Sequence, residues 1–292
     1  MLVKKTDLLQ EERKERIATD FFNHVNDFHK LDVKADPKIE QLLLEQQKFE
    51  VSRLIDKPEK PHKYIFSPSG TSKCKRELYY KLKGEKPVEQ RYPYQRRWTR
   101  NSTAIHSAIQ RDLLYAEEYL VNPKFKVMKL DETGLPAWEE NLKSNVILIH
   151  NNMEFAIQGM MDGVLIYKDG THIGFEFKTK SNTNAQVGNY LMKDVADGHK
   201  LQAVAYSLLF GIDEFIFMYE AVAKDSWSKG EEARKDIRTF YYKVTDEDRK
   251  QVLDKFAEIV ESVETDTIPE METDKCTFCT YKHLCGGTDN DK

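Results

Sequence analysis

Hydrophobic residues recur every three or four positions in the first part of the chain, with charged residues between them. Over residues 7–55 this spacing predicts two charged helices, the second beginning after Pro37. A stretch over residues 56–62 contains two prolines and predicts a linker. We therefore expect a helical arm with its linker over residues 1–60 and a larger domain over residues 61–292.

After the linker, the pattern alternates between helical and strand-like periodicity. The expected elements, in order, are a helix over residues 101–120, strands over 146–150, 157–167 and 172–178, a helix over 195–210, strands over 214–221 and 237–244, and a helix over 246–263. This order predicts a mixed α/β core. No GxxxxGK[ST] phosphate loop occurs in the sequence, which excludes an ATP-driven motor of that type.

Composition adds limits on the class of protein. With 40% hydrophobic and 32% charged residues among 292, the chain has the composition of an ordinary globular protein. It has no run of eighteen apolar residues and no apolar stretch behind its first lysines, so we expect neither a membrane span nor a secretory signal, and a cytoplasmic location. The formal net charge of −4 argues against a strongly basic nucleic-acid binder. It does not exclude a nuclease, because such an enzyme carries carboxylates in its own active site.

Two short runs carry the candidate chemistry. Asp162 lies in Gly-Met-Met-Asp-Gly, and Glu176 and Lys178 lie in Gly-Phe-Glu-Phe-Lys-Thr. Side chains alternate between the faces of a strand, so Glu176 and Lys178 share one face, and we expect Phe175 and Phe177 to face the core. Charged groups at these positions of a central strand are costly unless a ligand compensates them.

The turn between these runs predicts their register. Residues 168–170 fit a three-residue hairpin loop in which Gly170 takes the left-handed conformation. That loop places Asp162 directly opposite Glu176, on the same face, whereas a two-residue loop would pair Asp162 with Phe177. Neighbouring carboxylates repel one another, and bound Mg²⁺ or Mn²⁺ relieves the repulsion. The alternative is a surface hairpin with ordinary acids and a solvated lysine.

Two predicted helices flank the hairpin and contribute further polar residues. His106 lies among small and apolar residues, where a histidine alone is more often a packing residue than a ligand. Gln202 and Tyr206 are separated by one helical turn and project from one face, which by itself is weak evidence for any function.

Taken together, the motifs form an ordered set, namely His106, Gly159-x-x-Asp162, Glu176-x-Lys178 and Gln202-x-x-x-Tyr206. This set resembles the RecB-type branch of the PD-(D/E)XK nucleases. The resemblance implies an α/β, restriction-endonuclease-like mixed sheet flanked by helices. It implies a Mg²⁺ or Mn²⁺ site formed by His106, Asp162, Glu176 and Phe177. The catalytic residues that it implies are Asp162, Glu176, Lys178, Gln202 and Tyr206.

The four cysteines lie on either side of these motifs. Cys74 precedes them, and Cys276, Cys279 and Cys285 follow in a C-x₂-C-x₅-C pattern. This arrangement resembles the iron–sulphur nucleases, a group that includes AddB and the CRISPR-associated protein-four family. The resemblance implies that all four cysteines hold a 4Fe–4S cluster, which would staple the C-terminus to the start of the domain. A Cys₄ zinc site, in which His283 could replace one thiolate, and disulfides are the alternatives.

The most basic and aromatic stretch covers residues 91–100. Its arginines can hold phosphates while its aromatic rings stack on unpaired bases, and we interpret it as a DNA-binding segment at the mouth of the site. The candidate DNA-contact residues are Arg91, Arg96, Arg97, Trp98 and Arg100. The alternative is a loop whose rings pack against the domain while its arginines are solvated.

The resemblance, which covers residues 64–286, implies a metal-dependent DNA nuclease of a bacterial, archaeal or phage-infected cell. Exonuclease activity on single strands or DNA ends is common in this group. A role in recombination, repair, phage replication or CRISPR adaptation follows from the same resemblance. The first sixty residues lie outside it and are a candidate surface for a protein partner. The alternatives are a non-catalytic DNA-binding or assembly subunit that retains the fold, and a zinc-stapled RNA-processing nuclease.

Overall fold

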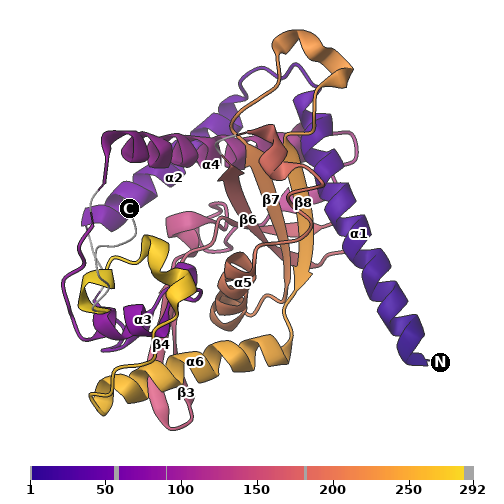
Figure 1. The fold of residues 1–292 in the computed structure, drawn as a ribbon. Helices are drawn as coiled ribbons and strands as arrows, with labels where there is room; N and C mark the ends of the chain where they lie inside the picture. The colour runs from indigo at the N-terminus through magenta and orange to yellow at the C-terminus, as the bar shows by residue number, and fades with distance from the viewer. Residues whose placement is uncertain (1, 56–58, 90, 181–182, 286–292) are drawn as a thin grey trace.

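A computed structural model describes residues 2–55, 59–89, 91–180 and 183–285 (Figure 1). The helices are α1 (Leu2–His29), α2 (Pro37–Ile55), α3 (Lys75–Leu82), α4 (Pro93–Tyr119), α5 (Asp197–Phe210) and α6 (Asp246–Glu264). The strands are β1 (Ile65–Phe66), β2 (Phe125–Val127), β3 (Ser144–His150), β4 (Met153–Gly159), β5 (Gly163–Tyr167), β6 (His172–Lys180), β7 (Glu214–Ala221) and β8 (Ile237–Lys243). None of the helices in these ranges combines the length and apolar character needed to cross a membrane.

The larger sheet has five strands in the order β2-β5-β6-β7-β8. The pair β6–β7 is parallel, and the pairs on either side of it, β5–β6 and β7–β8, are antiparallel. A smaller three-stranded sheet has the order β1-β4-β3. The predicted class, an α/β fold with mixed sheets flanked by helices, is therefore confirmed.

Both faces of the larger sheet are covered, because its central strands are apolar on both sides. In β7, Phe215 and Phe217 belong to one hydrophobic core and Ile216 and Met218 to another. The first core includes side chains of α5 and α6, and the second includes side chains of α1 and α4. The sheet is thus the middle layer of a three-layer packing, which is typical of strands that carry continuous apolar runs.

Helix α1 is part of this packing and runs beside β8 (Figure 1). Its buried residues Ile17, Phe21 and Val25 share the second core with strand residues, and Phe21 lies edge-on to Phe125 at 5.1 Å between ring centroids. From Ile17 onward, α1 therefore forms a layer of the sheet domain. A domain boundary at residue 60 stays a prediction, and residues 56–58 of the predicted linker lie outside the described ranges.

Two predicted elements need correction, and three short elements were not predicted. The apolar run 157–167 is not one strand, because it divides at residues 160–162 into the end of β4 and the whole of β5, which belong to different sheets. The helix predicted from residue 101 begins at Pro93, where proline favours the first helical turn. The short elements β1, β2 and α3 were not predicted, because too few residues carry their periodicity.

Candidate active site

The hairpin of β5 and β6 has the register that the sequence predicts. Gly163 pairs with Phe175, so the preceding position brings Asp162 opposite Glu176. The turn contains Gly170 at φ 86°, a left-handed conformation that glycine adopts without a steric penalty. Glycine at this position therefore fixes which two acids meet.

Asp162, Glu176 and Lys178 meet at one end of this hairpin. An oxygen of Asp162, Oδ2, accepts a hydrogen bond of 2.8 Å from the backbone N–H of Phe177. The ammonium group of Lys178 forms an ion pair with Glu176 Oε1. The other oxygen of this carboxylate, Glu176 Oε2, is buried and has no hydrogen-bond partner among the described residues. A buried carboxylate oxygen without a partner is costly, and a bound cation would satisfy it.

Phe175 and Phe177 face the core, as the sequence predicts, and both are fully buried. Glu176, on the other face of β6, is also buried, with 1% of its surface exposed. The phenyl ring of Phe177 offers no ligand atom, so this residue could contact a cation only through its main-chain carbonyl.

Helix α4 brings His106 to the hairpin from the opposite face. His106 Nδ1 lies 3.7 Å from Asp162 Oδ2, and the imidazole ring lies edge-on to the Phe177 ring at 4.9 Å between centroids. Burial, together with the nearby Lys178 ammonium group, lowers the pKa of His106. The imidazole is therefore neutral near pH 7, which is the form that binds metals.

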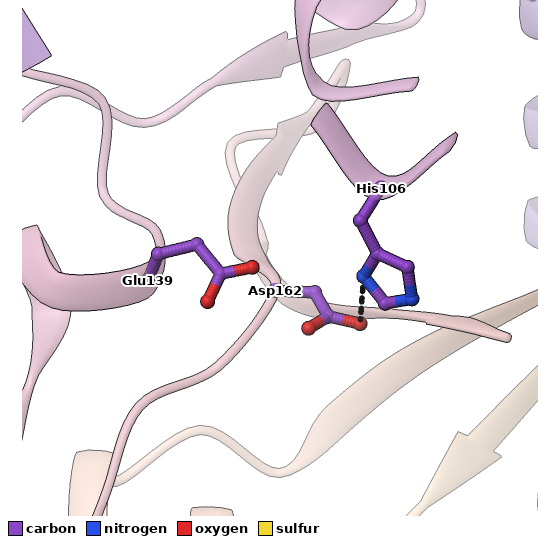
Figure 2. A group of neighbouring side chains, drawn as sticks. All are labelled: His106, Glu139 and Asp162. Carbon is purple, nitrogen blue, oxygen red and sulfur yellow. Dashed lines mark ion pairs between the residues drawn. The ribbon is translucent and has the colours of Figure 1, made fainter. Parts of the chain in front are cut away.

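A further ligand-bearing residue, Glu139, was not predicted. It begins the 3₁₀ helix η2 (Glu139–Leu142), and Figure 2 shows its carboxylate beside Asp162, with His106 on the other side. Potential ligand atoms of His106, Glu139 and Asp162 all lie within 4.8 Å of one another. No spacing in the sequence relates Glu139 to the hairpin motifs, because a loop between β2 and β3 delivers it.

The electrostatics of these acids favour cation binding. Burial is the main cause that raises the pKa of Asp162, Glu139 and Glu176 to about 7, and repulsion between the carboxylates adds to it. Burial alone would lower the pKa of Lys178, but the charges of Glu176 and Asp162 outweigh it, so its ammonium group stays charged. Carboxylate oxygens beside a neutral imidazole are a donor set that suits Mg²⁺ or Mn²⁺. These residues therefore fit the cation that the sequence predicts.

Helix α5 places Gln202 and Tyr206 next to the carboxylates. The side-chain amide of Gln202 donates a hydrogen bond of 2.8 Å to the Tyr206 hydroxyl, and both residues are buried. Burial and the charges of Glu176 and Asp162 raise the pKa of Tyr206 well above its usual range, so the phenol stays protonated. All of the motif residues that the sequence predicts for the site thus lie around one hairpin.

The two ends of the domain meet at the cysteines. Cys74 immediately precedes α3, and all four cysteines are free thiols. Burial raises the pKa of Cys276 and of Cys279, and in both cases the nearby Cys74 and Cys285 thiols raise it further.

Contacts around the thiols hold α3 against the C-terminal segment. The backbone N–H of Lys75 donates to Glu272 Oε2 at 2.8 Å, and the Tyr80 hydroxyl donates to the Leu284 carbonyl at 3.1 Å. The rings of Tyr80 and Tyr281 stack at 6.3 Å between centroids. Residues about two hundred positions apart in the sequence thus form one small cluster.

Most of the basic and aromatic stretch, from Pro93 onward, is the first part of α4 and not a loop. Tyr92 and Tyr94 stack at 6.0 Å between ring centroids, and Trp98 lies edge-on to Tyr94. Trp98 remains 52% exposed, so these rings pack on one another and not against the domain. The four arginines of the stretch, Arg91, Arg96, Arg97 and Arg100, are all exposed. Trp98 and His106 lie on the same helix, about 12 Å apart along its axis.

A family model for the PD-(D/E)XK nuclease superfamily matches residues 68–286. Comparison with curated protein sequences gives no match. Similar solved structures include "Crystal structure of SSO0001", with 15% identity, coverage of 85% of this chain and 95% of that chain, and a TM-score of 0.43. An alkaline exonuclease (LHK-Exo) from Laribacter hongkongensis has 10% identity, coverage of 70% and 89%, and a TM-score of 0.42. Because these TM-scores are low, the family match is the finding that bears on the identity of the chain.

Proposed function

This chain belongs to the PD-(D/E)XK nuclease superfamily, and we propose that it is a metal-dependent deoxyribonuclease that hydrolyses phosphodiester bonds. One observation carries the proposal. Glu176 is buried opposite Asp162 and paired with Lys178, and its second oxygen has no hydrogen-bond partner in the part of the chain that the structure describes. A protein that only binds DNA gains nothing from this destabilising arrangement, whereas a nuclease requires it.

Each residue of the hairpin has a role that follows from its contacts. Asp162 and Glu176 bind the cation, with His106 as a neutral ligand and the Phe177 carbonyl as a further candidate. A bound Mg²⁺ or Mn²⁺ supplies Lewis-acid polarisation of the phosphate. The backbone N–H of Phe177 fixes the orientation of the Asp162 carboxylate. Lys178, held by Glu176, orients the attacking water and stabilises negative charge that develops on the phosphate.

Gln202 and Tyr206 act as positioning residues in this proposal. Because the Gln202 amide donates to the Tyr206 hydroxyl, that hydroxyl can direct its own proton toward the carboxylates or a phosphate oxygen. Replacing Tyr206 by Phe should therefore lower the cleavage rate and leave the fold unchanged. Gln202→Ala should have a similar effect.

DNA with unpaired bases is the substrate class that the surface of α4 favours. Exposed arginines can contact phosphates, and the exposed Trp98 ring can stack on a base that is free of its partner. The continuous helix then leads from this surface to His106. We propose exonucleolytic action on single strands or DNA ends, in recombination, repair, phage replication or CRISPR adaptation.

We also propose that Cys74, Cys276, Cys279 and Cys285 hold a 4Fe–4S cluster. The origin of the cysteines at both ends of the domain, and the contacts that hold α3 against the C-terminal segment, support this assignment. Such a cluster would act first as a cross-link between the two ends of the domain, which lowers the conformational entropy of the unfolded chain. Iron and zinc analysis of protein purified without air distinguishes it from a Cys₄ zinc site.

A cleavage assay tests the enzymatic proposal. Protein purified without air is incubated with Mg²⁺ or Mn²⁺ and end-labelled single-stranded, duplex or circular DNA, with EDTA as the control. We expect metal-dependent release of label from single strands or ends, and slower attack on circles. Lys178→Ala should bind the same DNA and fail to cleave it. Cleavage that persists in EDTA would contradict the proposal.

A further inference from the structure

Glu139 belongs to none of the motifs that define the site, yet its carboxylate lies within it. Potential ligand atoms of Glu139, His106 and Asp162 all lie within 4.8 Å of one another. In Figure 2, Glu139 and His106 reach Asp162 from two sides and from two different segments of the chain. The three side chains thus surround a common point with two carboxylates and one imidazole.

No described lysine or arginine forms an ion pair with Glu139. The charged groups that raise its pKa are other carboxylates, those of Glu176, Glu50 and Glu140. Within the described ranges, its side-chain hydrogen-bond partner is the Gln110 amide, which donates to Glu139 Oε1 at 3.4 Å. The charge of Glu139 helps to raise the pKa of Lys178, but Lys178 forms its ion pair with Glu176, so Glu139 has no ion-pair partner of its own among the described residues.

The surrounding structure holds Glu139 in place. Its backbone has φ 47°, which is unusual for a residue with a side chain, and its N–H donates to the Met161 carbonyl at 2.9 Å. The Gln110 amide also donates to the Asp162 carbonyl at 2.9 Å. Trp138, the preceding residue, is fully buried, and its indole N–H donates to Gln46 of α2. The position of Glu139 relative to Asp162 is therefore fixed by several independent contacts.

The orphaned oxygen of Glu176 is the independent observation that points to a cation here. It lies on the residue opposite Asp162, is buried, and has no hydrogen-bond partner among the described residues. We propose that Glu139 is a further protein ligand of the divalent cation at this site, and that it holds the cation together with His106 and Asp162. The inference rests on the proposed nuclease function, since that function supplies the cation.

Glu140 provides a matched control. It is the next residue of the same 3₁₀ helix, carries the same carboxylate, and is paired with Lys143 at 3.0 Å. A loss of negative charge near the site would affect both variants, whereas a loss of ligation would affect only Glu139→Gln. The comparison therefore separates a direct contact from a general electrostatic effect.

The test is Mn²⁺ binding to the full chain, measured by calorimetry without DNA for the wild type, Glu139→Gln and Glu140→Gln. We expect Glu139→Gln to weaken Mn²⁺ binding at least about tenfold, the scale on which loss of metal-site contacts acts. Glu140→Gln should bind as the wild type does. Thermal unfolding in EDTA and in Mn²⁺ gives a second readout, because a ligand that binds only the folded state raises Tm.

The outcomes separate the two proposals. Glu139→Gln should keep the metal-free Tm and lose most of the Tm rise that Mn²⁺ produces in the wild type. Unchanged Mn²⁺ affinity in Glu139→Gln, with or without a lower metal-free Tm, would assign Glu139 a purely structural role and overturn this inference alone. If Glu139→Gln does not fold, Glu139→Asp is measured in its place. This variant should bind Mn²⁺ more weakly than the wild type, and an unchanged Mn²⁺ affinity would overturn the inference. A wild type that binds no Mn²⁺ would overturn this inference and the proposed function together.

Discussion

Replacing Asp162 by Asn should stabilise the metal-free protein while it abolishes cleavage. The side-chain oxygen of the introduced asparagine can still accept the hydrogen bond from the Phe177 N–H that Asp162 accepts in the wild type. The substitution removes a carboxylate that lies beside Glu139 and opposite Glu176. Because no cation offsets this repulsion in EDTA, the variant should unfold at a higher urea concentration than the wild type.

The magnitude follows from the pKa of Asp162. Burial is the main cause that raises this pKa from 3.8 to about 7. The folded protein therefore binds more protons than the unfolded chain between about pH 4 and pH 7, and stability falls as pH rises through that window. At about 1.4 kcal/mol for each pKa unit, the destabilisation above pH 7 approaches about 4 kcal/mol. Water that enters the site lowers this cost. We therefore expect the free energy of unfolding of Asp162→Asn to exceed that of the wild type by about 1 to 4 kcal/mol at pH 8.

Urea unfolding in EDTA at pH 8 and at pH 5 measures the effect. The advantage of Asp162→Asn should be largest at pH 8 and fall to less than half at pH 5, where the wild-type carboxyl is already protonated when folded. Asp131→Asn, which removes an exposed carboxyl from a turn, is the control and should change little. An Asp162→Asn variant that is less stable than the wild type at both pH values would refute the reasoning.

Three further predictions concern other parts of the molecule. Replacing both Arg96 and Arg97 by Ala should weaken the binding of single-stranded DNA. The slope of log K against log [salt] should become shallower by about 1.4, because each lost phosphate contact contributes about 0.7. An unchanged slope would contradict the DNA-contact assignment. Protein purified without air should absorb at about 400 nm and carry about four irons per chain. Cys74→Ser should remove the absorbance and the iron and should make the protein insoluble. An iron-free, colourless and fully active wild type would exclude the cluster. Gly174→Ala should destabilise the fold by about 1 to 3 kcal/mol in urea unfolding, because a Cβ there would overlap the buried Phe215 ring. A variant as stable as the wild type would show that β6 and β7 are not packed as described.

The active-site hairpin could be predicted from the sequence because its determinants are local. Gly170 selects the turn, the turn sets the register, and strand alternation then decides that Asp162 and Glu176 meet. The same reasoning explains why Lys178 lies on the Glu176 side of β6. Register is a short-range property, so it can be deduced without knowledge of the rest of the fold.

Other features depend on tertiary contacts that the sequence does not encode locally. Glu139 reaches the site because the preceding residue, Trp138, is buried and because the backbone N–H of Glu139 donates to the Met161 carbonyl. Neither contact leaves a periodic signal in the sequence. The run 157–167 looks like one strand, because its apolar residues continue through the segment where β4 ends and β5 begins. In each case, packing between distant segments decides the outcome.

The central claim is that Glu176, which lies beside Asp162 and Lys178 and has a buried oxygen without a partner among the residues described, belongs to a hydrolytic site. The most direct test is cleavage of end-labelled single-stranded DNA in Mn²⁺ by Glu176→Ala, with DNA binding measured on the same preparation. The account predicts that the variant binds DNA with wild-type affinity and releases no label, while the wild type releases it. Cleavage by Glu176→Ala at the wild-type rate would contradict the account.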